Sequence, residues 1–180
     1  MMVMAAKTSP SDLQIEVEVA ALSWHEMLPQ AEGICRVAAL AAWRAADSDL
    51  VLAMAGHEIE VSVRLTDDNE IAALNQDYRA RADATNVLSF AAFTEADLVA
   101  LPAGAPVLLG DVVMACGVVA SEADIQGKSV ANHFSHLVVH GMLHLLGYDH
   151  IEEIDAEVME RLETTILATL GIADPYVELG

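Results

Sequence analysis

The chain has 180 residues and a formal net charge of −20, from 8 basic and 28 acidic side chains. Hydrophobic residues make up 54% of it, which excludes wholesale disorder, and the length fits one domain with a true core. The negative charge argues against a nonspecific nucleic-acid-binding protein, because such binding depends on lysine and arginine side chains that neutralise phosphates.

The composition also bears on location. The mean hydropathy of +0.40 raises the question of a membrane segment. The longest apolar stretch, 98–120, contains Asp111, two prolines and three glycines, whereas a spanning helix needs about 20 apolar residues without such breaks. We predict a loop and a buried strand there, and no membrane segment. The N-terminal segment 1–10 is too short for a secretion signal, and Cys35 and Cys116 fit reduced thiols, so we expect a cytoplasmic protein.

Patterns of apolar residues predict the elements of the first half of the chain. Apolar residues alternate with polar ones over 13–19 and again over 59–65, as in strands with one buried face. The alanine-rich segment 29–46 between them predicts a helix. A second helix is predicted to start at Thr66-Asp67-Asp68 and to continue to Tyr78, and a short β-prone run follows over 85–90.

The second half is predicted to contain a loop, a strand and two helices. Glycine and proline mark 91–106 as a long loop, and 107–114 is typical of a strand. Ser129 or Asn132 caps a helix that ends near Leu146, and 152–170 forms the last helix. Because strands precede and interleave with helices, the predicted fold class is α+β. We expect one domain over 1–180, with residues 1–10 flexible.

Five of the seven histidines lie between His133 and His150, and three of them have the spacing of a metal site. His140 and His144 are four residues apart and therefore project from one face of the predicted helix. Gly147 can adopt the left-handed conformation that ends a helix, so that His150 returns to the same point. Zinc accepts three imidazoles at about 2.0–2.1 Å and keeps a fourth position for water in catalytic sites. We predict one Zn²⁺ per chain, bound by His140, His144 and His150.

The helix that carries these histidines is apolar nearly all round, so we expect a metal site on a buried helix. Unpaired imidazoles in a core cost desolvation energy, which favours metal ligands over packed histidines. The spacing matches the metzincin protease pattern His-x-x-x-His-x-x-Gly-x-x-His, in which a glutamate general base follows the first histidine. This chain has Gly141 there, so the metal geometry is retained but the protease base is missing.

The run His140-Gly-Met-Leu-His-Leu-Leu-Gly-Tyr-Asp-His150 resembles the signature of the YbeY family of bacterial endoribonucleases, which mature rRNA. Two further segments are similar to elements of that family. Leu74-Asn-Gln-Asp-Tyr-Arg79 with Thr85-Asn-Val-Leu-Ser-Phe90 resembles Asn-x-x-Tyr-Arg and Thr-Asp-Val-Leu-Ser-Phe, and Leu109-Gly-Asp-Val112 resembles Leu-Gly-Asp-Ile. The likeness covers roughly residues 58–165.

Two residues depart from the family's pattern. Asn86 stands where the family usually has aspartate, which removes a carboxylate near Arg79, and Ala84 replaces the usual proline, which loosens a turn. The resemblance implies a small mixed β-sheet with surrounding helices, histidine-bound zinc, and single-strand-specific RNA cleavage in rRNA processing and ribosome quality control. The implied partners are rRNA and ribosomal particles or ribosomal proteins, and neither DNA nor a membrane.

Four residues besides the three histidines are further candidates for the site, and the resemblance strengthens the first of them, Arg79. Arg79 is the candidate catalytic residue, because its planar fork matches phosphate oxygens and can stabilise charge that develops at phosphorus. Asp111, at a Gly-Asp step in an apolar strand, is expected to be a buried carboxylate that needs a partner. It is a candidate either to orient a metal ligand or to form a cap or loop hydrogen bond. His136, one turn before His140, and Asp149, next to His150, are further candidates to orient a ligand, and Asp149 is also a candidate base.

The sequence leaves the nucleophile and two other functions open. The nucleophile is either water activated by the metal, with no separate base, or the 2′-hydroxyl of the RNA. One alternative function is a zinc hydrolase of another ester or of peptides, which the missing glutamate disfavours. The other is a ribosome-associated module with structural zinc. The favoured interpretation is a metal-dependent endoribonuclease.

Overall fold

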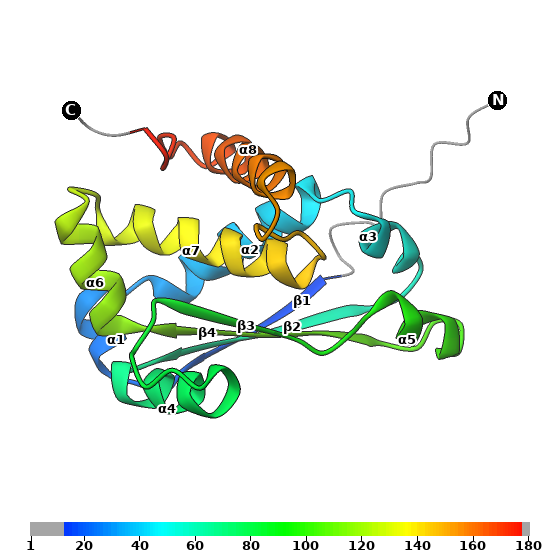
Figure 1. The fold of residues 1–180 in the computed structure, drawn as a ribbon, viewed down its shortest axis with the longest axis horizontal. Helices are drawn as coiled ribbons and strands as arrows, with labels where there is room; N and C mark the ends of the chain where they lie inside the picture. The colour runs from blue at the N-terminus through cyan, green and yellow to red at the C-terminus, as the bar shows by residue number, and fades with distance from the viewer. Residues whose placement is uncertain (1–12, 178–180) are drawn as a thin grey trace.

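A four-stranded sheet organises the computed structural model, which describes residues 13–177 (Figure 1). The sheet order is β1-β2-β4-β3, in which β1, β2 and β4 run parallel and β3 runs antiparallel to β4. The predicted α+β class and the mixed sheet are therefore confirmed. The expectation of flexibility over 1–10 lies outside the described residues. The strands are β1 (Leu13–Val19), β2 (Ile59–Thr66), β3 (Val87–Ala91) and β4 (Val107–Ala115).

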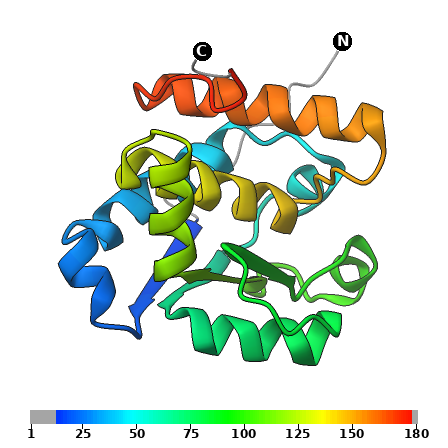
Figure 2. The ribbon, with the colours of Figure 1, turned by 60° about the vertical axis from the view of Figure 1, so that its left-hand side comes forward.

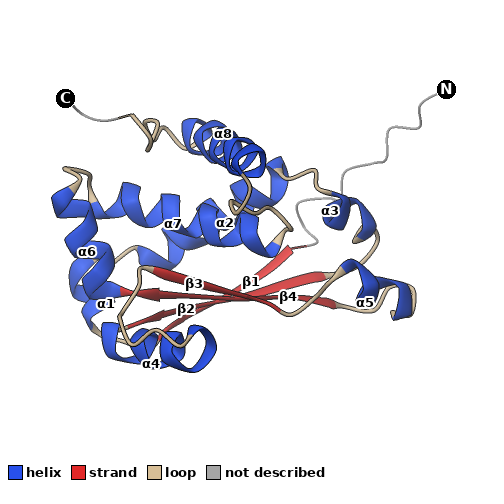
Figure 3. Cartoon of the chain, in the orientation of Figure 1, coloured by secondary structure: helices blue, strands red, loops and turns tan. Residues whose placement is uncertain are grey.

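The helices are divided between the two faces of the sheet (Figures 1 and 3). α4 (Asp68–Arg79) covers one face, whereas α2 (Ala31–Ala45) and α7 (Val130–Leu145) pack together over the other. α8 (Glu153–Thr169) lies on α2 and α7 as an outer layer. Among the described residues, no helix combines the length and apolarity needed to cross a membrane. The shorter helices are α1 (Ser23–Met27), α3 (Asp49–Ala53), α5 (Glu95–Ala100) and α6 (Cys116–Ile125).

Alternation along β4 divides the buried side chains between two clusters. Val112 belongs to the main core with residues of α7, such as Val138. Val113, the next residue, points to the opposite face and packs in a smaller cluster with Ile71 of α4 and Leu88 of β3. The sheet therefore separates the α7 side from the α4 side, and its edge strand β3 contributes side chains to both.

The close pairing of β3 with β4 requires a glycine. Gly110 has φ +149° and lies just past a register shift between β2 and β4. A Cβ atom at this position would overlap the carbonyl oxygen of Phe90 in β3, so a residue with a side chain would push the edge strand away. This explains the glycine of the Leu-Gly-Asp element in steric terms.

The short helices are absent from the predictions made from the sequence. α5 falls inside the segment predicted as loop, and α6 follows β4 directly where only a loop and a strand were expected. The start of α6 has no capping side chain of its own. Instead, the amide of Val118 donates to Oδ1 of Asp68, 3.1 Å away on α4. Because the residue that caps α6 is so distant in the chain, the sequence around Cys116 contains no pattern that marks the start of a helix.

Candidate metal centre

The two ends of α7 are set by local hydrogen bonds. At its start, the Ser129 side chain accepts from the amide of Asn132 at 3.1 Å, so Ser129 rather than Asn132 is the cap. At its end, Gly147 has φ +94°, and the amide of Tyr148 donates to the carbonyl of Leu143 at 3.0 Å. This left-handed turn, typical of a helix terminus, reverses the chain after α7 and brings the following loop back over the helix.

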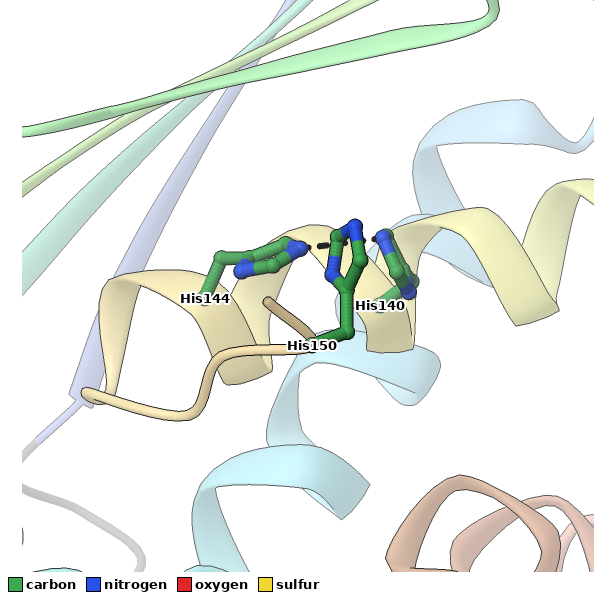
Figure 4. A group of neighbouring side chains, drawn as sticks. All are labelled: His140, His144 and His150. Atoms are coloured by element: carbon green, nitrogen blue, oxygen red, sulfur yellow. Dashed lines mark hydrogen bonds between the residues drawn. The ribbon is translucent and has the colours of Figure 1, made fainter. Parts of the chain in front are cut away.

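The reversal brings three imidazoles together, as Figure 4 shows. His140 and His144 project from α7, and His150 comes from the loop that follows. Each of the three offers one ring nitrogen, and these nitrogens all lie within 4.8 Å of one another. The three side chains are therefore placed to hold one metal ion.

The hydrogen bonds of two rings determine which nitrogen faces the site. Nδ1 of His140 lies 2.6 Å from a carboxylate oxygen of Glu163, and Nδ1 of His144 lies 3.1 Å from the carbonyl oxygen of Tyr148. Both oxygens act as acceptors, so each Nδ1 carries the proton and each Nε2 of the neutral ring carries a lone pair. These two Nε2 atoms are only 3.1 Å apart. Two facing lone pairs repel unless a cation lies between them, so the donor set fits a metal.

The surroundings of His144 favour the neutral form that metals bind. Burial lowers its pKa, and the nearby rings of His140 and His150 lower it further. The site is nevertheless not enclosed, because His140 and His144 are only partly buried and His150 is exposed. The expectation of a buried site therefore needs correction: the body of α7 is buried, but its histidines open onto a cleft.

Glu163 of α8 is a site residue that the sequence analysis missed. Its side chain is completely buried, with one oxygen bound to His140 and the other 3.0 Å from Nε2 of His136 and hydrogen-bonded to the hydroxyl of Tyr176. Burial raises the pKa of Glu163, but the bonds from His136, His140 and Tyr176 outweigh it and lower that pKa to about 2. The sequence contains one indication that Glu163 is buried, because it lies at helical spacing in line with the apolar residues Met159 and Ile166 of α8.

The three predicted positioning residues have different surroundings. His136 bonds to Glu163, the carboxylate that also binds His140, and its ring lies edge-on to that of His140 with centroids 6.4 Å apart. Asp149 accepts the amide of His150 at 2.6 Å through Oδ1, and so shapes the loop that carries this histidine. Asp111 is exposed, and alternation along β4 places it on the same face as Val113, opposite α7. The expectation that Asp111 is a buried carboxylate beside the ligands is therefore wrong.

Arg79 lines the same cleft as the three histidines. It is the last residue of α4, and Ala80 after it has the left-handed φ of +53°. Among residues 13–177, Arg79 forms no ion pair. The cleft has a volume of about 660 Å³ and crosses the edge of β3 between α4 and the end of α7. Its lining comprises Arg79, Thr85, Asn86, Val87, Ser89, His140, His144, Gly147, Tyr148, Asp149, His150 and Ile151.

Asn86 is tied to α6 rather than to Arg79. Its side-chain amide donates to both carboxylate oxygens of Glu122, at 3.0 and 3.2 Å, and its Oδ1 accepts the amide of Val87 at 2.7 Å. An aspartate at this position would place a second carboxylate against Glu122. Asparagine therefore suits this chain, because its amide can donate to Glu122 where a carboxylate could not.

Gly141 packs directly on the sheet. A Cβ atom there would lie 3.0 Å from Cγ1 of Val112 and 3.2 Å from Oγ of Ser89, both closer than ordinary contacts. A side chain at this position would therefore crowd Val112 of β4 and Ser89 of β3, so the close approach of α7 to the sheet favours glycine here.

The mixed sheet, the converging histidines and the arginine across one cleft define a candidate metal-dependent hydrolase. The family model described as Endoribonuclease YbeY matches residues 39–171. An Endoribonuclease YbeY of Paramagnetospirillum magneticum is 48% identical over 167 residues, which are 92% of this chain and 97% of the relative. That of Rhodospirillum rubrum is 46% identical over 172 residues, which are 94% of this chain and 85% of the relative.

The chain belongs to the YbeY family of endoribonucleases. Its fold is similar to the solution structure of TM1509 from Thermotoga maritima, with a TM-score of 0.51 at 19% sequence identity, covering 91% of this chain and 99% of the other. The family expected from the three sequence elements is thus confirmed by matches over most of the chain.

Proposed function

We propose that this chain is a zinc-dependent endoribonuclease that cleaves single-stranded RNA in rRNA processing and ribosome quality control, in the cytoplasm. The observation that carries the proposal is the pairing of two kinds of group in one cleft. His140, His144 and His150 converge in the cleft, and Arg79, which has no ion pair among residues 13–177, lines the same cleft. Three neutral imidazoles suit zinc, and a lone guanidinium suits a phosphate.

The residues of the cleft have separable roles in this proposal. His140, His144 and His150 would hold one zinc ion, which when bound lowers the pKa of water and polarises a phosphoryl oxygen. Arg79 donates hydrogen bonds to the phosphate and stabilises the charge that develops on it. Glu163 keeps the proton of His140 on Nδ1, so that its Nε2 faces the cleft.

Two routes remain for the proton that leaves the nucleophile. Asp149 lines the cleft and is the carboxylate placed to accept a proton from water. Attack by the 2′-hydroxyl of the RNA would instead leave a cyclic phosphate on one product. The end groups of the products distinguish the two routes, and only the second requires RNA rather than DNA.

Two other functions were left open by the sequence. Peptide hydrolysis is disfavoured, because Gly141 supplies no glutamate base and any side chain there would crowd Val112 and Ser89. A purely structural zinc is disfavoured by the open cleft beside the three ligands, since structural sites use four protein ligands.

Cleavage of an unstructured RNA tests the proposal directly. The zinc-loaded protein should cut the RNA, and a chelator should abolish cutting while circular dichroism shows an intact fold. DNA of the same sequence should stay intact where the 2′-hydroxyl is the nucleophile. His144→Ala serves as the inactive control. Cutting that survives complete zinc removal would contradict the metal-dependent mechanism, and a folded, zinc-loaded protein that cuts no RNA would contradict the function. Copurification with ribosomal particles tests the proposed partners.

A further inference from the structure

A large aromatic side chain is exposed on α4, directly before a residue that lines the cleft. Tyr78 directly precedes Arg79 in α4, and 69% of its surface is accessible to solvent. Its ring packs against the ring of Phe90 in β3, with centroids 5.0 Å apart and planes tilted by 57°. Phe90 thus supports the tyrosine while most of the ring remains open.

The backbone around Tyr78 is held in place by a buried asparagine. Asn75, one helical turn earlier, is 5% exposed, and its side-chain amide donates to the carbonyl of Asp83 at 2.8 Å. The carbonyl of Asn75 accepts the amide of Arg81 at 3.3 Å. The turn after α4 is therefore anchored at two points, and the side chains on it are presented from a fixed backbone.

Asp77 directly precedes Tyr78, but the two basic residues that follow it are unusual for this chain. The chain carries only 8 basic residues against 28 acidic ones. Arg64 is paired with Glu18 and Glu70, whereas Arg79 and Arg81 are exposed and form no ion pair within the described part of the chain. Two arginines with no ion pair among the described residues therefore follow one exposed aromatic residue within three positions of the chain.

This combination matches the requirements of single-stranded RNA. Proteins that bind single strands pair cationic groups, which contact phosphates, with aromatic rings, on which the bases stack. An exposed tyrosine alone would be an ordinary surface residue. With Arg79 lining the catalytic cleft, the two arginines that follow Tyr78 favour a nucleotide over an apolar protein partner.

The edge of the sheet connects the cleft to Tyr78. Ser89 of β3 lines the cleft on the α7 side, whereas the next residue, Phe90, packs with Tyr78 on the α4 side. α7 and α4 lie on opposite sides of the sheet (Figure 2), and β3 is its edge strand. A strand of RNA that leaves the cleft past Arg79 and over this edge therefore meets Tyr78.

We propose that Tyr78 is a stacking platform for one base of the RNA, at a nucleotide that adjoins the phosphate bound by Arg79. The proposal rests on the proposed function, because it names a base-binding subsite for the same substrate. It predicts that the enzyme recognises an unpaired, unstacked base next to the cleavage position without reading its hydrogen-bonding edge.

A fluorescent base tests for the platform without any cleavage. 2-Aminopurine is placed at each position in turn around the cut site of an RNA, and its fluorescence is measured on binding to the zinc-free protein. Quenching beyond that of free RNA is expected at one position. This quenching should be lost in Tyr78→Ala and Tyr78→Leu and retained in Tyr78→Phe, because stacking needs the ring and not the hydroxyl.

Kinetics separate a base-binding role from a structural one. Tyr78→Ala should raise KM by about fivefold to a hundredfold, the range for loss of one base stack, and leave kcat nearly unchanged. Tyr78→Phe should restore KM. Ile125→Ala, which truncates an exposed side chain on α6, is the control and should have no effect. Zinc content and circular dichroism verify that each variant is folded.

Removal of the base itself completes the test. For the wild-type protein, KM should be higher for an RNA that is abasic at the quenched position than for the intact RNA, by the same factor as Tyr78→Ala raises it. For Tyr78→Ala, the abasic RNA and the intact RNA should have the same KM. The platform would be overturned if the abasic RNA and Tyr78→Ala raised KM additively, or if Tyr78→Ala had the wild-type KM with every substrate. In either case, RNA cleavage by the wild-type protein would still support the proposed function. Absence of RNA cleavage and of quenching in the wild type would overturn both.

Discussion

Nδ1 of His140 and Oε1 of Glu163 lie 2.6 Å apart, and the glutamate side chain has no contact with solvent. The same carboxylate binds His136 and the hydroxyl of Tyr176. The outer helix α8 and the segment after it are thereby connected to a candidate metal ligand. A buried carboxylate with three donors and no cationic side chain is best explained as the partner that orients a metal-binding imidazole.

Replacement of Glu163 by glutamine tests this relationship. The amide retains one acceptor for His140 but directs its NH₂ group at His136 and Tyr176, which now lack an acceptor. We expect zinc affinity to fall about 10- to 100-fold, the usual cost of losing such a partner. Competition with a chromophoric chelator measures it. Glu157→Gln, an exposed change on the same helix, should bind zinc normally, and equal affinities for both variants would rule out the role of Glu163.

Replacement of His144 tests the ligand set. The purified wild-type protein should contain about one zinc per chain, because three neutral imidazoles suit this metal. His144→Ala should lose the metal, whereas His25→Ala, an exposed histidine on α1, should keep it. Elemental analysis of the three proteins provides the comparison. Full zinc content in the His144 variant would show that the ligands are assigned wrongly.

Replacement of Arg79 tests the phosphate contact separately from metal binding. Arg79→Ala should fold and retain zinc but lose RNA cleavage by about 10²- to 10³-fold, as when a donor to a developing oxyanion is removed. Arg79→Lys should restore activity only in part, because an ammonium lacks the planar fork. Arg44→Ala, an exposed change on α2 outside the cleft, is the control. Wild-type cleavage by the alanine variant would exclude the phosphate contact.

The features that the sequence predicted correctly are local ones. The alternation in β1 and β2 follows from one buried face per strand, and the histidine geometry follows from helical spacing and the turn at Gly147. Such patterns depend only on residues that are close together in the sequence.

The features that it missed depend on contacts between distant segments. Glu163 reaches His140 only because α8 folds back on α7, and α6 is capped by Asp68 of α4. The burial of Asp111 was predicted wrongly for a related reason. Its strand is apolar on both faces, so the pattern could not indicate which face carries the charge or that this face is open there.

His133 provides a test of how stability depends on pH. It is buried on α7, where burial lowers its pKa more than the hydrogen bond to Glu122 raises it, while His136 and Lys128 lower it further. The folded state therefore disfavours the charged ring, and below the ordinary histidine pKa of about 6.5 the unfolded state takes up more protons. The free energy of unfolding should fall through this window as the pH drops.

A glutamine at this position isolates the contribution of His133. His133→Gln keeps a donor for Glu122 but does not titrate, so its stability should decline less steeply than that of the wild type between about pH 7 and pH 5.5. Urea unfolding at equal zinc loading measures the difference. A steeper decline in the variant would mean that Glu122 raises the pKa of His133 overall, contrary to the predicted sign.

The net charge of −20 leads to the last prediction. Such a chain repels free RNA, and Arg79 and Arg81 are the basic pair beside the cleft. If these two neutralise about two phosphates, binding of a short single strand should be weak, with a log–log salt slope of only about −1.4. Acidic surfaces instead steer proteins toward basic partners, an attraction that salt screens. Binding to ribosomal particles, whose proteins are basic, should therefore be tighter and should weaken as salt rises. Titrations of both ligands over the same range of salt make the comparison. Tight binding of free RNA with a steep slope would reveal a basic groove elsewhere and would exclude docking through the acidic surface.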